Sequence, residues 1–387
     1  MVENWQRAGF GVYIHWPFCE AKCPYCDFNS HVVSEIDQEA WANAYISEIT
    51  RSYQVTSNKK LSTIFFGGGT PSLMSAETVN KIIYHIQSLW KLSDNLEVTL
   101  EANPSSVETS KFSEYKSAGI NRVSIGVQSL DNSSLRYLGR LHSAEDALRA
   151  INVAKSTFER VSFDLIYSRQ NQTVREWEAE LLYALSLGIN HMSLYQLTIE
   201  HGTVFGDRLK IGKLHGLPSD DKSADMYNVT QDIMEAHNLP QYEISNHASP
   251  GEASEHNLIY WRGGDYVGIG PGAHGRYYEN KQRRATVKTK DPNSWLIQVQ
   301  KQGHGEETNL SVSNSDEALE YLLMAARLSE GIDLKFLESL DLNAINYKKL
   351  NDLSKAKFLY TSTNNKRLFI APIGRAILNS ILAELIS

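Results

Sequence analysis

Short apolar runs rich in β-branched and aromatic residues alternate with stretches of helical periodicity from residue 11 to about residue 200. Several of these runs are apolar almost throughout, as expected of strands that are buried on both faces of a parallel sheet. The six predicted strands are Gly11–Trp16, Thr63–Gly67, Glu97–Glu101, Arg122–Gln128, Arg160–Tyr167 and His191–Leu197. The alternation is typical of βα units around a parallel sheet.

Two segments between these strands carry clear helix signals. The first is a stripe of large side chains at every fourth position, which can cover the sheet, formed by Trp41, Tyr45, Ile49 and Tyr53. The second is the capping-box pattern of Ser143 and Asp146, which predicts that a helix begins there. Six βα units fall short of a complete eight-unit barrel. We therefore expect an α/β fold, a partial (β/α)6 TIM-like barrel, with its site at the carboxyl ends of the strands.

The pattern changes after residue 200. A helix is predicted over Asp220–His237 and a strand over Gln241–Ser245, followed by a Gly-rich segment, Val267–Gly275. The polar stretch Tyr278–Thr289 is predicted to be a loop. The Gly-rich segment contains GxGxxG, but Pro271 interrupts it and no helical periodicity follows, so it is not a dinucleotide-binding fingerprint.

A smaller C-terminal domain is predicted over residues 291–387, after a core of residues 1–290. Asp316–Leu328 is patterned as a helix, Phe358–Ala371 as a β-hairpin around Asn364 and Asn365, and Ile373–Ile386 as a last helix. This order indicates a helical, winged-helix-like domain. Residues 341–387 carry seven Lys or Arg against three acids. A nucleic-acid role is therefore weighed, but a solvated small domain is favoured.

Composition narrows the class of protein. The 387 residues are 42% hydrophobic and 21% charged, with no run of eighteen apolar residues and no export signal at the N-terminus, so a cytoplasmic protein without a transmembrane segment is expected. The net charge of -7 argues against a protein that mainly neutralises phosphates, and no nucleic-acid partner is expected.

The only cysteines, Cys19, Cys23 and Cys26, follow the first predicted strand within eight residues. An odd, clustered set in a chain without an export signal does not indicate a disulfide framework. Such thiolates suit zinc or an iron-sulfur cluster. A zinc site needs a fourth ligand, which His15 or His31 could supply. A thioredoxin-like redox pair is disfavoured because the rest of its context is absent.

The spacing Cys-xxx-Cys-xx-Cys at the end of a first strand resembles that of the radical S-adenosylmethionine (SAM) enzymes. Tyr13-Ile-His-Trp-Pro-Phe-Cys19 is similar to the form in the oxygen-independent coproporphyrinogen oxidase (HemN) group. The resemblance implies that the three thiolates bind a [4Fe-4S] cluster whose open iron chelates SAM. An electron from the cluster then cleaves SAM to a 5′-deoxyadenosyl radical.

The same resemblance implies a SAM-binding set at the strand ends. Gly67-Gly-Gly-Thr-Pro71 resembles the loop that receives the SAM amino group, where glycines let the backbone approach. The implied SAM contacts are Tyr13, Gly68, Gly69, Thr70, Glu101, Gln128, Arg140 and Asp164. The segment Gly268–Gly275 resembles the closing Gly-rich motif of the family and is expected to line the same pocket.

One departure from the family pattern lies after Asp164-Leu-Ile-Tyr167. The family often has Gly-Leu-Pro-Gly there, whereas this chain has Ser168-Arg-Gln-Asn171. This departure leaves open the shape of the loop and the access that it gives to substrate.

Three features point within the group to the HemW-type haem chaperones. Phe28 stands where the oxidases usually carry a fourth cysteine, and only eighteen residues precede Cys19. The hexapeptide His256-Asn-Leu-Ile-Tyr-Trp261 resembles the HNxxYW haem-binding motif, which implies haem contacts by His256, Asn257, Tyr260 and Trp261.

We therefore expect a haem chaperone that uses a [4Fe-4S] cluster and SAM, receives electrons from a donor, and passes haem to acceptor respiratory haemoproteins at the membrane. The alternative is an oxygen-independent oxidase that decarboxylates coproporphyrinogen III to protoporphyrinogen IX. A second alternative is a zinc-stabilised nucleic-acid-binding module. Whether SAM is cleaved productively stays open.

Overall fold

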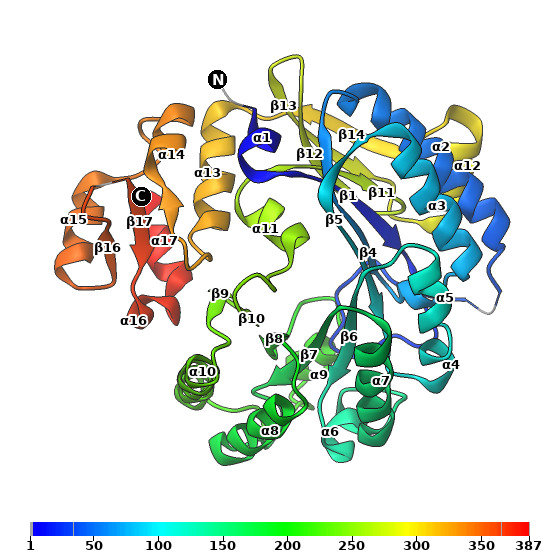
Figure 1. The fold of residues 1–387 in the computed structure, drawn as a ribbon. Coiled ribbons are helices and arrows are strands. Elements are labelled where there is room, and N and C mark those ends of the chain that lie inside the picture. Colours follow the sequence, from blue (N-terminus) through cyan, green and yellow to red (C-terminus); the bar gives the residue numbers. More distant parts are fainter. Residues whose placement is uncertain (1–2, 34, 365, 387) are drawn as a thin grey trace.

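The computed structural model describes residues 3–33, 35–364 and 366–386. Its main feature is a twelve-stranded sheet that curves in an arc (Figure 1). The strand order is β14-β13-β12-β11-β1-β4-β5-β6-β7-β8-β10-β9. The edge strands β14 (Glu306–Ser311) and β9 (Gln241–Glu243) do not pair with each other, so the barrel is open, as predicted.

All six predicted strands are present and parallel. They are β1 (Phe10–Trp16), β4 (Lys60–Gly68), β5 (Lys91–Ala102), β6 (Arg122–Gln128), β7 (Arg160–Tyr167) and β8 (His191–Gln196). A further strand, β11 (Asp265–Ile269), pairs in parallel with β1 on its other side. It comes from the Gly-rich segment, so the parallel part of the sheet extends beyond the six predicted units.

Helices cover the outer face of the arc (Figure 1). They are α2 (Gln38–Thr56), α3 (Ala76–Leu89), α5 (Phe112–Ser117), α7 (Ala144–Thr157) and α8 (Val174–Ser186). The predicted apolar stripe lies on α2, where three of its four side chains are buried and Tyr53 is half-buried. The predicted capping box of Ser143 and Asp146 begins α7. The helical stripes and the sheet form one large hydrophobic core.

The prediction of a loop at Tyr278–Thr289 is wrong. A hairpin of β12 (His274–Glu279) and β13 (Gln282–Lys288) occupies this stretch, with Asn280 and Lys281 in the left-handed region at its turn. The hairpin was not predicted because several of its inward-facing side chains are charged and form buried ion pairs, so apolar and polar residues do not alternate. Arg283 lies 3.1 Å from Asp265 and Lys288 lies 3.4 Å from Glu48. Burial of a charge is tolerated where an opposite charge and hydrogen bonds accompany it.

The Gly-rich segment forms an inner part of the sheet, between β1 and β12, and does not line the cysteine cavity. A Cβ on Gly268 would lie 2.1 Å from the carbonyl oxygen of His274, and one on Gly270 would lie 2.5 Å from that of His15. The carboxylate of Glu48 accepts from the amide of Gly270 at 2.8 Å. These glycines therefore allow close backbone approach between β1, β11 and β12.

The C-terminal elements contain a second hydrophobic cluster, from Ala318 to Leu385. They are α13 (Asn314–Ala325), β15 (Ile332–Asp333), α14 (Leu334–Leu340), α15 (Tyr347–Lys355), β16 (Leu359–Thr361), β17 (Arg367–Ile370), α16 (Pro372–Arg375) and α17 (Leu378–Ile386). The predicted hairpin is confirmed as β16 and β17, although Asn365 lies outside the described residues. The predicted last helix is divided into α16 and α17.

The division of the chain at residue 290 stays a prediction. The strand β14 belongs to the large sheet, and the helix α12 (Pro292–Gln302) packs against α2, where the ring of Trp295 stacks on that of Trp41 with centroids 5.2 Å apart. The second cluster begins only in α13. We therefore describe α13 to α17 with their strands as the C-terminal unit.

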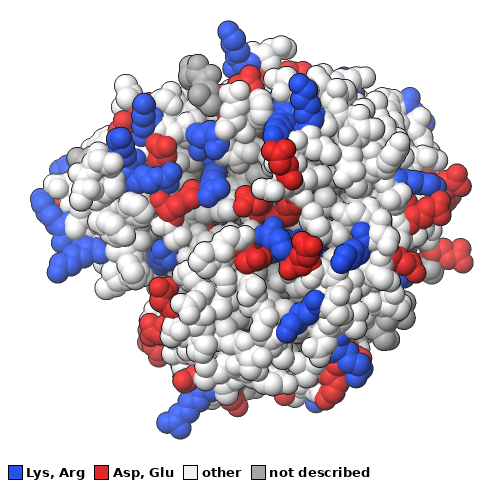
Figure 2. Space-filling model, viewed as in Figure 1, with Lys and Arg blue, Asp and Glu red and all other residues white. Residues whose placement is uncertain are grey.

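Acidic and basic side chains are interspersed over the face shown in Figure 2. Blue side chains are more frequent at the left of this view, over the C-terminal unit, where some red side chains lie among them. None of the described helices combines the length and the apolarity that a bilayer crossing needs.

Candidate functional site

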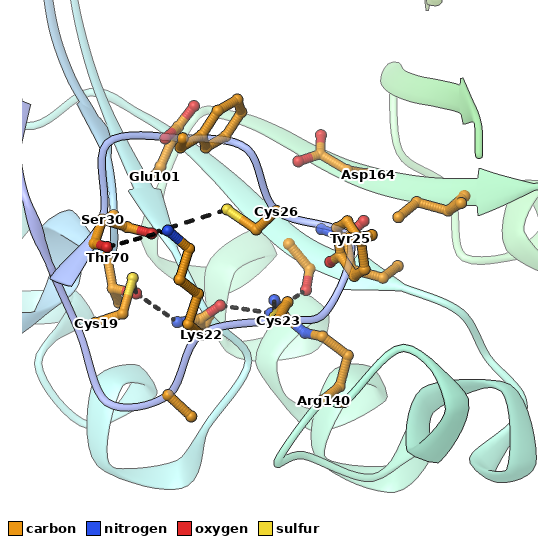
Figure 3. A pocket seen from close by; sticks show the side chains of 18 of the residues that line it. Cys19, Lys22, Cys23, Tyr25, Cys26, Ser30, Thr70, Glu101, Arg140 and Asp164 are labelled. Carbon is orange, nitrogen blue, oxygen red and sulfur yellow. Dashed lines mark hydrogen bonds between the residues drawn. The ribbon is translucent and has the colours of Figure 1, made fainter. Parts of the chain in front are cut away.

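The cysteine loop lies at the carboxyl ends of the parallel strands. Cys19 ends the short strand β2 (Phe18–Cys19), which pairs with β3 (His31–Val32), and the loop between them carries Cys23 and Cys26. All three cysteines are half-buried and line a cavity of about 460 Å³ (Figure 3). The same cavity is lined by Gly68, Gly69, Thr70, Glu101, Gln128, Arg140 and Asp164. The structure thus brings the predicted cluster ligands together with seven of the eight predicted SAM contacts.

Hydrogen bonds connect two of the sulfurs through Asn103. Arg140 donates to the Sγ of Cys23 at 3.4 Å and to the Oδ1 of Asn103 at 2.5 Å. Asn103 donates to Thr70 at 3.1 Å, and Thr70 donates to the Sγ of Cys19 at 3.4 Å. Sequence reasoning missed Asn103, although its position just after Glu101 at the end of β5 could have indicated it. This network orients donors toward the two sulfurs, where they would offset the negative charge of cluster-bound thiolates.

The Gly67-Gly-Gly-Thr loop packs directly on the cysteine segment. A Cβ on Gly68, whose φ is 114°, would lie 2.6 Å from the ring of His15, and one on Gly69 would lie 2.7 Å from the carbonyl oxygen of Phe18. The amide of Thr70 donates to the carbonyl of Phe18 at 2.8 Å. The glycines are therefore required for β4 to hold β2 at the cavity wall.

Two carboxylates face the cavity from β5 and β7, the strands on either side of β6. Burial and the nearby charge of Asp164 raise the pKa of Glu101 to about 8. Burial raises the pKa of Asp164 to about 6, although hydrogen bonds from Ser193 and the charge of Arg122 oppose this shift. A negative charge is costly at both positions without a cation, so the pair favours a positively charged ligand.

Gln128 lies at a strained position of the cavity wall. Its φ is 67°, in the left-handed region, and the register between β6 and β7 shifts between Ile125 and Gln128. Backbone strain of this kind is concentrated at functional sites and bulges re-aim side chains there.

Tyr13 lies in a second cavity, of about 300 Å³, inside the barrel. This cavity shares Glu101 and Asp164 with the first one, so it lies directly behind the predicted SAM site. The hydroxyl of Tyr13 is 3.0 Å from the Nδ1 of His15. Two further polar lining residues, Arg122 and His191, were missed because they lie within apolar strands.

The predicted haem residues lie on α11 (Glu255–Trp261), and none of them lines the cysteine cavity. His256 is 1% exposed. Its Nδ1 is 2.6 Å from the Oγ1 of Thr63 and its Nε2 is 2.6 Å from the hydroxyl of Tyr260. Both ring nitrogens are therefore engaged, and the arrangement does not offer an imidazole nitrogen to a haem iron. Asn257 lines the second cavity with His256 and Tyr260, whereas Trp261 does not.

The histidines that could complete a zinc site are also engaged. The Nε2 of His15 is 2.9 Å from the carbonyl oxygen of Asn29, and that of His31 is 3.1 Å from the Oδ1 of Asn29. Within residues 3–33, 35–364 and 366–386, no three His, Cys, Asp or Glu side chains are arranged around a single ion. A cubane instead distributes its cysteine ligands over three irons, which fits thiols that line a space beside Arg140.

The loop that departs from the family pattern keeps a backbone that suits glycine. Ser168 and Asn171 stand where the family has its two glycines, and their φ values are 61° and 57°. Between them, Arg169 is buried and pairs with Glu180 at 2.5 Å. The amide of Asn171 donates to the carbonyl of Gly216 at 2.6 Å, which holds the segment after β8.

That segment reaches the cysteine loop through α9 (Val204–Lys210). The amide of Phe205 donates to the carbonyl of Pro24 at 2.8 Å, and the ring of Phe205 lies 6.5 Å from that of Tyr25. Phe205 is buried, so this contact shields one side of the loop from water.

Comparison with known proteins identifies relatives along the chain. A model of the radical SAM superfamily matches residues 13–184. The chain is 37% identical to Heme chaperone HemW of Escherichia coli over 322 residues, 82% of each chain. It is 34% identical to Heme chaperone HemW of Bacillus subtilis over 385 residues, 97% of this chain and 99% of the relative.

A mitochondrial relative and a solved structure agree with this. Radical S-adenosyl methionine domain-containing protein 1, mitochondrial, of Bos taurus is 35% identical over 99% of this chain and 88% of its own length. The structure of coproporphyrinogen III oxidase (HemN) from Escherichia coli aligns with a TM-score of 0.81 over 98% of this chain and 90% of that one. At 19% identity this likeness shows a shared fold. The chain belongs to the radical SAM superfamily, in the group that includes HemW.

Proposed function

We propose that this protein is a haem chaperone that binds haem, a [4Fe-4S] cluster and SAM, and passes haem to acceptor haemoproteins. The observation that carries the proposal is 34–38% identity to several Heme chaperone HemW proteins over most of the chain. The cysteine cavity supports the cluster and SAM, because thiols, cation-favouring carboxylates and close-packed glycines line it together. Respiratory proteins at the membrane are the proposed acceptors and the cytoplasm is the proposed location.

Different residues of the cavity would hold the cluster and SAM. Cys19, Cys23 and Cys26 would hold the cluster, while Arg140 and Thr70 donate to two of the thiolates. When bound, the cluster and SAM supply one-electron reduction of a sulfonium. The carboxylates of Glu101 and Asp164 would attract the positive charge of SAM from the strand ends. The size of the cavity is within the usual range for small-molecule sites, about 300–1,000 Å³.

The second candidate is oxidative decarboxylation of coproporphyrinogen III. The fold shared with HemN favours it, because the strand-end cavity is available to either activity. Phe28 weighs against it: this side chain is 59% exposed at the cavity and stands where that group usually has a fourth cysteine.

A paired anaerobic assay on reconstituted protein separates the two functions. Haem is titrated and followed by its absorbance, and coproporphyrinogen III is supplied with SAM and a reductant in parallel. We expect haem binding, transfer to an apo-haemoprotein and no turnover of the porphyrinogen. Turnover with weak or absent haem binding would establish the oxidase instead.

A further inference from the structure

A third cavity, of about 330 Å³, lies between the barrel and the C-terminal unit, away from the cysteines. One wall consists of α11 and β11, through Tyr260 and Tyr266, whose rings meet edge to face with centroids 4.5 Å apart. The facing wall is α13, through Leu323 and Met324. These two side chains are 39% and 36% exposed, so the cavity opens to solvent beside α13.

Arginines stand beside this apolar and aromatic wall. Arg276 lies 3.0 Å from Glu320 and is neutralised by it. Arg327 lies over the ring of Trp261 at 5.5 Å from its centroid. Arg327 is half-buried, and its charge opposes the rise that burial causes in the pKa of Glu243, but among the described residues no carboxylate lies within ion-pair distance of it. The cavity therefore combines flat apolar surfaces with a guanidinium that is available to an anion.

A ligand that matches this lining is flat, mostly apolar and carries carboxylates at one edge. Haem has this chemistry, and the proposed function supplies it as the cargo. The cavity is at the lower end of the range for ligand sites, so part of the macrocycle would stay exposed at α13. A partly exposed cargo suits a protein that must release it to an acceptor.

We propose that haem binds in this cavity, against Tyr260, Tyr266, Leu323 and Met324, with a propionate on Arg327. The inference rests on the proposed function and assigns its haem site. The hexapeptide then acts through its aromatic residues: Tyr260 lines the cavity and Trp261 supports Arg327. His256 is a positioning residue, because its Nε2 lies 2.6 Å from the hydroxyl of Tyr260 and so fixes the orientation of the Tyr260 ring. The thioether of Met324 and the phenol of Tyr266 are the groups at this wall whose chemistry suits haem iron, because the Tyr260 hydroxyl is already engaged by His256.

The test is haem titration of the full-length protein with single substitutions. We expect Arg327→Glu and Met324→Glu each to raise the Kd for haem at least tenfold. Leu319→Glu is the matched control for Met324→Glu, because Leu319 also lies on α13 with similar exposure, 37%, but does not line the cavity. Unchanged iron and sulfide content and an unchanged unfolding midpoint show that each variant is folded.

Three outcomes separate the inference from the proposed function. Wild-type protein that fails to bind haem removes the proposed function. Wild-type binding that Arg327→Glu and Met324→Glu leave unaltered, while Phe28→Ser and Leu141→Ser at the cysteine cavity weaken it, places haem at that cavity and overturns the inference. His256→Ala that abolishes the haem spectrum while Arg327→Glu and Met324→Glu do not would assign ligation to the imidazole and overturn it equally.

Discussion

Cys23 differs from the other two cysteines because a charged donor contacts it. Arg140 donates to its Sγ at 3.4 Å, and that guanidinium also donates to the carbonyl of Gly126 at 2.9 Å. The loop is otherwise held by backbone contacts that do not involve the thiol, such as that of Phe205 with Pro24. We therefore expect Cys23→Ser to lose the cluster and keep the fold, since a hydroxyl is a poor ligand for iron at neutral pH.

Iron and acid-labile sulfide analysis of the reconstituted variant, with circular dichroism, measures this. Asp27→Asn in the same loop is the control, because Asp27 is exposed and carries no thiolate. Iron and sulfide at the wild-type level in Cys23→Ser would contradict the assignment of this residue as a ligand.

Glu101 makes the stability of the SAM-free protein depend on pH. Its pKa of about 8 is above the ordinary value of 4.5, so the folded state binds more protons than the unfolded state between roughly pH 4 and pH 8. The free energy of unfolding should therefore decrease as the pH rises through this window. Glu101→Gln removes this contribution, and we expect a variant more stable than wild type by about 1–2 kcal/mol above pH 8, after allowing for water in the cavity.

Urea unfolding over a pH series measures the difference. Glu77→Gln is the control, because Glu77 is fully exposed and its pKa is lowered by the adjacent Lys81. A constant difference between Glu101→Gln and wild type across the series would show that the carboxyl does not carry a raised pKa.

At this scale the sequence predicts residues whose role depends on a local motif. The cysteine spacing and the strand-end positions of Glu101 and Asp164 could be recognised, because parallel strands deliver their carboxyl ends to one edge. The hydrogen bonds that engage both nitrogens of His256 could not, because Thr63 is 193 residues away in the chain and nothing local indicates the contact.

At the scale of single elements, the loop after β7 places two residues other than glycine, Ser168 and Asn171, in the left-handed region. Asn171 adopts a φ of 57°, which Asn tolerates better than most residues and Gly adopts freely. We expect Asn171→Ala to destabilise the protein by about 1 kcal/mol. Alanine has a Cβ that makes the left-handed conformation unfavourable, and it lacks the short polar side chain with which Asn can hydrogen-bond locally. Urea unfolding midpoints measure this.

Asn171→Gly is the matched control, since it removes the same side chain and accepts the backbone angle. If the glycine variant lost as much stability as the alanine variant, the contact of the Asn171 side chain with Gly216 would be the cause, and not the backbone.

The hairpin of β12 and β13 is an element that the hydrophobic pattern of the sequence did not predict. Strand prediction depends on alternation of apolar and polar residues. Here Arg283 and Lys288 are buried in pairs with Asp265 and Glu48, which come from distant segments. The six parallel strands were predictable because both of their faces are apolar, and this hairpin was not because its burial depends on tertiary ion pairs.

At the scale of the whole molecule, the contacts between the barrel and the C-terminal unit include several polar ones. Arg262 of the barrel forms a two-point pair with Glu330, at 2.9 and 2.7 Å, and Arg276 pairs with Glu320 at 3.0 Å. Arg7 lies over the ring of Phe336, 3.6 Å from its centroid. Since the two units have separate hydrophobic clusters, the C-terminal unit can open while the barrel stays folded.

Weakening the Arg262 pair should therefore affect one unit more than the other. Both side chains are about a third exposed, 34% and 37%, so the pair contributes no more than about 1 kcal/mol. We expect Glu330→Gln to speed amide hydrogen exchange severalfold in α13 and β17 and to leave β4 to β6 unchanged. Asp94→Asn, which breaks the exposed pair of Asp94 with Lys60, should change neither region. Bound haem should slow amide hydrogen exchange in both α13 and α11, because the ligand would then contact both helices. Equal acceleration of β4 to β6 in Glu330→Gln would show that the two units unfold as one.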